Sequence, residues 1–88
     1  MSHITMTVKV FKEGEVYVAL CPELDVSSFG EDIKSAEKSL REAIEAFLEE
    51  CEAMGTLEEV LEDAGFVKEQ DKWVVEEPLI ETKMALSC

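Results

Sequence analysis

Two carboxylates in an extended stretch come closest to a catalytic arrangement in this sequence. Glu23 and Asp25 stand two positions apart, so on an extended backbone their side chains share one face. Carboxylates that hold two Mg²⁺ ions about 4 Å apart carry out phosphoryl transfer in many nucleases. Further ligands are not evident, because the helical acids Glu37 and Glu42 are predicted on the side that faces water. Two acids at a strand end are more often turn or edge residues, so the sequence favours a chain that is not an enzyme.

The histidine and cysteine content argues against metal and thiol chemistry. His3 is the only histidine, and the three cysteines, Cys21, Cys51 and Cys88, have no CxxC spacing. A zinc site or another cofactor is therefore not expected, and no further histidine is available as a base for a nucleophilic thiol. We expect Cys21 and Cys51 to be buried as small hydrophobic residues.

Acidic residues dominate the chain, and they concentrate in its middle. The formal net charge is -13, and residues 31–63 hold twelve acids against three bases, a net charge of -9. Direct nucleic-acid binding by this chain alone is disfavoured, because phosphates are neutralised by a basic face. A basic protein partner is favoured instead, with simple solubility of a small acidic protein as the alternative.

The acids at the end of the predicted long helix break a local rule. Glu49, Glu50 and Glu52 fall in its last turn, where the helix macrodipole favours bases by about 0.3 to 1 kcal/mol each. A cationic partner would compensate for this cost, whereas a solvated face would tolerate it. We therefore predict a partner-binding set of acids along the helix, formed by Glu42, Glu45, Glu49, Glu50 and Glu52.

Alternating apolar residues predict the strands that precede this helix. At the start of the chain every second residue is apolar, at Ile4, Met6, Val8 and Val10. A turn at residues 12–14 leads into a second strand, residues 16–21. Both faces of that strand are apolar, so it should lie inside a sheet. Residues 24–29 are expected to form a third, more polar extended segment.

A capped long helix is predicted next, and a short helix after it. Asp32 is the expected N-cap, with a side chain that accepts an orphan backbone N–H of the first turn. Apolar residues then recur on one helical face, at Ala36, Leu40, Ala43, Ile44, Phe47, Leu48 and Cys51. Gly55 should close this helix in a left-handed conformation. The pattern Thr56-Leu57-Glu58-Glu59 is a capping box that opens a short helix over residues 57–64.

The pattern of residues 66–88, the last part of the chain, predicts short strands. Extended segments are expected around Phe66, from Trp73 to Val75, and again beyond Pro78. Trp73 fits two roles, a core residue that covers the sheet or an anchor in an interface. Because a thin core leaves a sheet edge uncovered, we predict a homo-oligomer, at least a dimer. Its predicted interface is formed by apolar residues of this last part of the chain: Trp73, Val74, Val75, Leu79 and Ile80.

Length and pattern together predict one α+β domain over residues 1–88, with a core at about residues 4–54. We expect a three-stranded antiparallel sheet with the long helix packed on one face, a short second helix and C-terminal strands. No apolar run approaches the roughly 18 residues that span a bilayer, and the N-terminus lacks a signal-peptide core. A cytoplasmic protein is therefore expected, without a membrane partner.

The stretch over residues 17–47 resembles the core of the HicB antitoxin family. The similarity lies in the order of its parts: an apolar strand ending in Cys21-Pro22, an extended segment, Gly30 followed by two acids, and a helix with alanine steps at Ala36 and Ala43. Over roughly residues 4–54 this resemblance implies a reduced ribonuclease H-like fold. It also implies a partner, a small basic HicA-type RNA-cleaving toxin. Longer HicB antitoxins carry a DNA-binding module after the core, but about twenty residues are too few for one here, so operator binding is not expected.

The expected function is that of a stand-alone antitoxin that covers its toxin through contacts and charge. A homo-oligomeric interaction or regulatory domain without a toxin partner is the first alternative. A minimal nuclease is the second.

Overall fold

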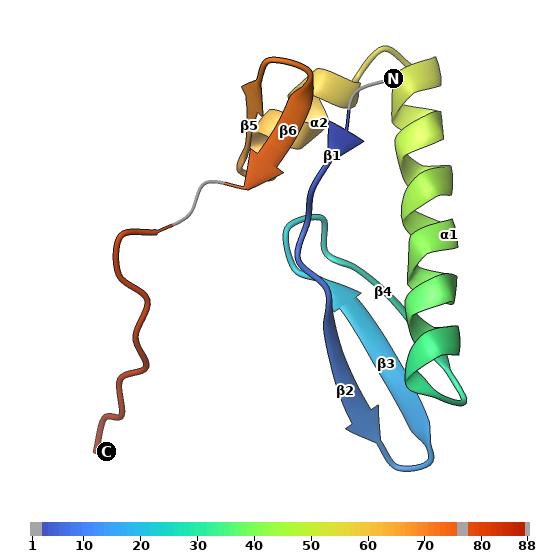
Figure 1. Ribbon diagram of the computed structural model, residues 1–88, viewed down its shortest axis with the longest axis vertical. Coiled ribbons are helices and arrows are strands. Elements are labelled where there is room, and N and C mark those ends of the chain that lie inside the picture. Colours follow the sequence, from blue (N-terminus) through green and yellow to red (C-terminus); the bar gives the residue numbers. More distant parts are fainter. Residues whose placement is uncertain (1–2, 76–77, 88) are drawn as a thin grey trace.

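The computed structural model describes residues 3–75 and 78–87, and within them the chain forms two helices and two three-stranded sheets (Figure 1). The strands are β1 (His3–Ile4), β2 (Lys9–Glu13), β3 (Val16–Cys21), β4 (Val26–Gly30), β5 (Phe66–Glu69) and β6 (Lys72–Val75). The helices are α1 (Ile33–Ala53) and α2 (Leu57–Asp63). The predicted α+β class with one long helix is confirmed. In these ranges neither helix is long and apolar enough to cross a membrane.

The larger sheet is antiparallel, in the order β2, β3, β4, so β3 is central as its two apolar faces predicted. Val18 of β3 pairs with Phe11 on one side and Phe29 on the other, while its neighbour Ala19 pairs with Val10. Because side chains alternate across a strand, these two rows point to opposite faces of the sheet. The row of Ala19 and Val10 packs under α1, and the row of Val18 faces away from it.

The second sheet, in the order β1, β6, β5, corrects the prediction of a single antiparallel sheet. β5 and β6 form an antiparallel hairpin, but β1 pairs with β6 in parallel, His3 with Lys72 and Ile4 with Trp73. The strand predicted over residues 4–10 is therefore divided between two sheets. The physical reason is that the backbone continues in one direction from β1 to β2 while its pairing partner changes from β6 to β3 (Figure 1).

α1 begins at the predicted cap and lies very close to β4. The Asp32 carboxylate accepts the backbone N–H of Ser35 at 2.7 Å, and the Ser35 hydroxyl accepts the N–H of Asp32 at 3.1 Å. The backbone bond from Ser35, with its hydroxyl second, holds the pKa of the Asp32 carboxyl below its usual value. Gly30 permits the close approach, because a Cβ there would stand 2.5 Å from the Ala36 backbone nitrogen. After the helix, Gly55 adopts the predicted left-handed conformation, with φ +73°.

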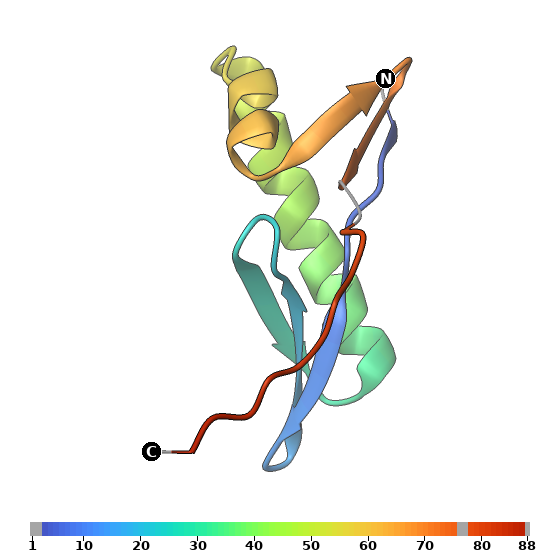
Figure 2. The same ribbon diagram turned by 90° about the vertical axis from the view of Figure 1, so that its left-hand side faces the viewer.

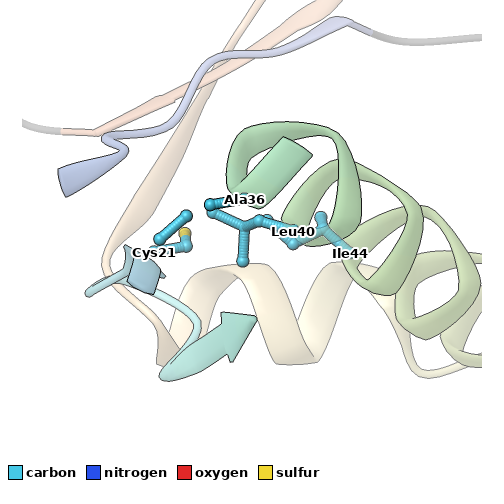
Figure 3. Close-up of a cluster of buried hydrophobic side chains, with 5 residues drawn as sticks. Cys21, Ala36, Leu40 and Ile44 are labelled. Atoms are coloured by element: carbon cyan, nitrogen blue, oxygen red, sulfur yellow. The ribbon is translucent and has the colours of Figure 1, made fainter. Parts of the chain in front are cut away.

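Small side chains fill the contact between α1 and the larger sheet (Figure 3). The buried residues of this first cluster are Ala19 and Cys21 from β3 and Ala36, Leu40 and Ile44 from α1. Cys21 is therefore a buried small hydrophobic residue, as predicted. A helix packed on alanine and cysteine can approach a sheet more closely than one packed on leucine, which sets a tight spacing between the two layers.

A second cluster joins α2 to the second sheet. Its buried residues are Leu61 of α2, Phe66 of β5 and Trp73 of β6. Trp73 is only 4% exposed, so in this chain it is a core residue. The capping box predicted at Thr56 does not form: its backbone N–H and its hydroxyl both point back to the carbonyl of the buried Cys51, at 2.9 and 3.3 Å. The Thr56 hydroxyl therefore bonds to the end of α1 and makes no cap hydrogen bond to α2.

Residues 78–87, which we call the tail, make no strand pairing in the described structure. Their large apolar side chains are between 80% and 104% exposed: Leu79, Ile80, Met84 and Leu86. In Figures 1 and 2 the tail runs on the side of the larger sheet that faces away from α1. The tail thus adds apolar surface to that side without burying it.

Candidate partner-binding surface

The solvent-facing side of α1 holds a line of acids in its C-terminal half. Glu42, Glu45, Glu49 and Glu52 are exposed and follow one another at steps of three or four residues, so they lie along one side of the helix. We call these four residues the acidic ridge. Glu50 is also exposed, but at about 100° per residue its side chain points to another flank of the helix. The structure thus brings four of the five predicted partner-binding acids together.

Within α1 the charged side chains run against the helix macrodipole, although the Asp32 carboxylate at the N-cap is favourable to it. The bases of the helix, Lys34, Lys38 and Arg41, precede the ridge, while the first turn has no acid and the last turn no base. Among the described residues the one ion pair joins Lys68 Nζ to Glu58 Oε1 at 3.7 Å, so no ridge carboxylate has such a partner there. Acids near a helix C-terminus are repelled by one another and by the dipole. A cationic surface placed against the ridge would relieve both repulsions.

α2 widens this acidic surface. Its apolar residues Leu57 and Leu61 pack into the second cluster. Its acids are all exposed: Glu58, Glu59, Glu62 and Asp63. Figure 1 shows α2 beside the C-terminal end of α1, so both sets of acids lie at the same end of the molecule.

A groove of about 750 Å³ separates α1 from the segment that links β1 to β2. Its apolar lining includes Met6 and Val8 from the linking segment and Ile44 and Leu48 from α1. The bases of α1 line it too, together with Glu45 of the acidic ridge. An apolar trough beside both basic and acidic side chains suits a segment of a protein partner better than a small polar ligand.

The two carboxylates that suggested catalysis have different roles in the structure. Asp25 is exposed in a turn, with φ +54°, whereas the Glu23 carboxylate accepts the Thr7 backbone N–H at 3.0 Å and the Cys21 thiol at 3.5 Å. Burial acts to raise the pKa of Glu23, but hydrogen bonds from Thr7, from its own backbone and from Cys21 together hold that pKa below its ordinary value. Burial also raises the pKa of the Cys21 thiol. Over residues 3–75 and 78–87 no three side chains gather as a metal-ligand group.

The residues of the predicted oligomer interface lie in two different environments. Trp73 is buried in the second cluster, Val75 packs against that cluster, and Val74 is half-buried. Leu79 and Ile80 are exposed in the tail. Only the last two are open to a second chain in this conformation, and a role for the tail in self-association stays a prediction.

Besides the groove, the pattern-based predictions missed the face of the larger sheet that α1 leaves uncovered. Phe11 is 49% and Phe29 69% exposed, and Val18 lies between them in a row across the three strands. Val16 and Leu20 flank this row on β3. We call these five residues the open face. A signal for it existed, because both faces of β3 are apolar while the sequence offers one long helix to cover the sheet.

The geometry therefore offers three surfaces for function: the acidic ridge, the groove beside it and the open face on the other side of the sheet. All three are suited to binding a protein. Comparisons with models of protein families, with curated proteins and with solved structures found no match to this chain.

Proposed function

We propose that this chain is a HicB-like antitoxin that binds a small basic HicA-type RNA-cleaving toxin and covers its active surface. The observation that carries the proposal is the acidic ridge, whose four exposed carboxylates have no ion-pair partner in the described ranges. Glu49 and Glu52 also lie near the C-terminal end of α1, where negative charge is unfavourable. The resemblance of residues 17–47 to the HicB core supports the class of the partner.

The mechanism is occupation of a basic surface. An RNA-cleaving protein must present cations to the phosphates of its substrate, and those cations also attract carboxylates. Bound there, the acidic ridge takes the place of RNA and blocks access to the active surface. Its charge speeds association, while the apolar groove beside it adds contacts that slow dissociation.

A second candidate is a homo-oligomeric interaction domain without a toxin partner. The exposed aromatic residues of the open face and the exposed apolar tail favour it. The two candidates differ in the partner they require. Co-purification of a short basic protein encoded beside this gene favours the antitoxin, and repeated recovery of this chain alone favours the second candidate.

Binding to that basic protein is the test of the ridge. The variant Glu42→Gln, Glu45→Gln, Glu49→Gln, Glu52→Gln should bind at least about tenfold more weakly, chiefly through a slower association rate. Association of the unmodified chain should slow as salt rises from about 50 to 500 mM, because the screening length shortens from roughly 14 to 4 Å. Thermal stability of the ridge variant should stay equal or rise, since it removes repulsion between like charges.

The matched control changes the same number of charges elsewhere. Exposed acids outside both helices are replaced in the variant Glu15→Gln, Glu31→Gln, Glu69→Gln, Asp71→Asn. This control should bind nearly as well as the unmodified chain. Equal losses in the two variants would mean that net charge, and not the ridge, governs binding, and binding that is indifferent to salt would contradict the electrostatic mechanism.

The nuclease alternative has its own test. Highly purified chain should not cleave RNA in Mg²⁺ or Mn²⁺, because Glu23 is held by Thr7 and Cys21 and Asp25 lies in an exposed turn. Metal-dependent cleavage that disappears in a Glu23→Gln, Asp25→Asn variant would overturn the proposed function.

A further inference from the structure

We propose that two copies of this chain pair through their open faces, with the larger sheets stacked on each other and the α1 helices outside. This inference goes beyond the antitoxin proposal, because it concerns a surface on the opposite side of the sheet from α1. The result would be four layers in the order helix, sheet, sheet, helix. Each half would supply the cover that the other half lacks.

The open face has the character of half an interface. Phe11 and Phe29 stand at the two edges of the sheet with Val18 between them, so one apolar row crosses all three strands. Val16 extends the apolar area along β3 and is 40% exposed. A continuous apolar area containing two exposed aromatic rings is unusual on an isolated small protein and marks a site of association.

Charge identifies a second copy as the occupant. The chain has a net charge of -13, but the side chains on this face include one base and one acid, Lys9 and Glu13, both on β2. They lie two residues to either side of Phe11, so they share its face. This surface is therefore locally neutral, and it neither attracts a basic partner nor repels its own copy.

A two-fold axis along the row of Phe11, Val18 and Phe29 makes the face complementary to itself. That rotation reverses the strand direction while keeping β2 over β2. Lys9 of one protomer then faces Glu13 of its partner, and the pair occurs twice. In the same way Val16 faces Leu20 of the partner subunit, and each residue of the central row faces its twin. Stacked sheets about 10 Å apart leave room for these side chains to interdigitate.

The position of α1 is compatible with this pairing. α1 and the acidic ridge lie on the far side of each sheet, so two ridges stay free at opposite ends of the dimer. The tail, in which Leu79 and Ile80 are exposed, runs on the open-face side (Figure 2), so it lies on the side from which the partner approaches. The open face and the exposed tail thus lie on the same side of the larger sheet.

The test measures the molecular mass of the full chain in solution by sedimentation equilibrium. The unmodified chain should be a dimer at micromolar concentration, and Phe29→Lys should be a monomer with an unchanged far-ultraviolet circular dichroism spectrum. Lys9→Glu and Glu13→Lys should each weaken the dimer about tenfold, since each turns two attractive pairs into repulsive ones. The double variant Lys9→Glu, Glu13→Lys should restore the affinity. Lys12→Glu, the same change on the other face of β2, is the control and should leave the dimer intact.

Three outcomes would overturn the proposal. The first is an unmodified chain that is monomeric at micromolar concentration. The second is a dimer that survives Phe29→Lys but is lost in a Leu79→Asp, Ile80→Asp variant, which would move the interface to the tail. The third is a double charge variant no tighter than the two single variants. The charge variants test the pairing even if Phe29→Lys fails to fold, because Lys9 and Glu13 are exposed and their substitution should not disturb the core.

Discussion

The two hydrophobic clusters of this molecule differ in the size of the side chains that fill them. In the first cluster, under α1, three of the five buried residues are alanine or cysteine. In the second cluster, under α2, the buried residues are a leucine, a phenylalanine and a tryptophan. In the first cluster most buried side chains are too small to lose much volume on truncation, and larger side chains would not fit. The second depends on a few large side chains and should be most sensitive to their removal.

The clusters are nevertheless parts of one folded unit. Met6, Leu24 and Leu48 each pack against both of them. A loss in one cluster therefore loosens residues that also line the other. Cooperative unfolding in a single transition is expected, and the substitutions below should change its midpoint without dividing it in two.

The largest effect is expected from Trp73→Ala in the second cluster. Trp73 is 4% exposed and contacts residues from α2, β5 and the N-terminal segment. Its removal should lower the free energy of unfolding by about 3 to 5 kcal/mol. Urea denaturation followed by circular dichroism measures this, because the variant has no tryptophan fluorescence. A loss below about 1 kcal/mol would mean that the second cluster adds little to the stability.

Leu40→Ala probes the one large side chain that is wholly enclosed in the first cluster. Leu40 is 1% exposed and lies over Cys21 and Ala36 (Figure 3). We expect a loss of about 3 kcal/mol, from lost burial and from a cavity that the small neighbours cannot fill. If Leu40→Ala costs more than Trp73→Ala in the same denaturation experiment, the proposed contrast between the clusters is reversed.

Gly30→Ala tests whether the first cluster resists added volume. The new Cβ would lie 2.5 Å from the Ala36 nitrogen and 2.7 Å from the Ser35 carbonyl carbon, both backbone atoms that move only with the helix. We expect a loss of about 1 to 3 kcal/mol. Gly55→Ala is the comparison, since no atom lies within 4 Å of its added Cβ and only left-handed backbone strain remains, about 1 kcal/mol. Equal losses at the two glycines would show that the helix has room to move.

The smallest effect concerns pH and the Glu23 carboxylate. Hydrogen bonds from Thr7 hold its pKa below the ordinary value of 4.5, so their stabilising contribution is present above that pH and is lost as pH falls through the folded-state pKa. Glu23→Gln should lower the stability at neutral pH. The stability of this variant should then fall less than that of the unmodified chain as the pH is lowered. Melting temperatures between about pH 6 and 3 measure this. Asp25→Asn, which leaves the bond to Thr7 in place, should decline in acid as the unmodified chain does.

Local signals in the sequence predicted the local structure well. The Asp32 cap, the left-handed Gly55, the central β3 and the helical face buried by Leu40 and Ile44 are all as expected. Each depends on residues a few positions apart. Such features follow from capping, backbone strain and periodicity alone.

The errors arose where two possible partners compete, one more distant in the sequence than the other. The alternation from Ile4 to Val10 is the same whether a strand pairs with β3 or β6, so it could not show the division into β1 and β2. Thr56 has the capping-box pattern, but its hydroxyl donates a hydrogen bond to the Cys51 carbonyl instead of capping α2. For the candidate site, spacing placed four of the five predicted acids along one side of α1, with Glu50 on another flank, and their role in binding stays a prediction. The groove and the open face depend on which side of the sheet the helix covers.

The parallel pairing of β1 with β6 also sets an order of events during synthesis. It joins His3 to Lys72, and the Thr5 N–H donates to the Trp73 carbonyl at 2.9 Å. The larger sheet and α1 are made of neighbouring segments and can assemble as soon as they leave the ribosome, whereas the second sheet must wait for residue 75. Until then the N-terminal strand has no partner at residues 3–5. In a nascent chain the first residues therefore have no hydrogen-bonded strand partner until β6 has been synthesised and can pair with them.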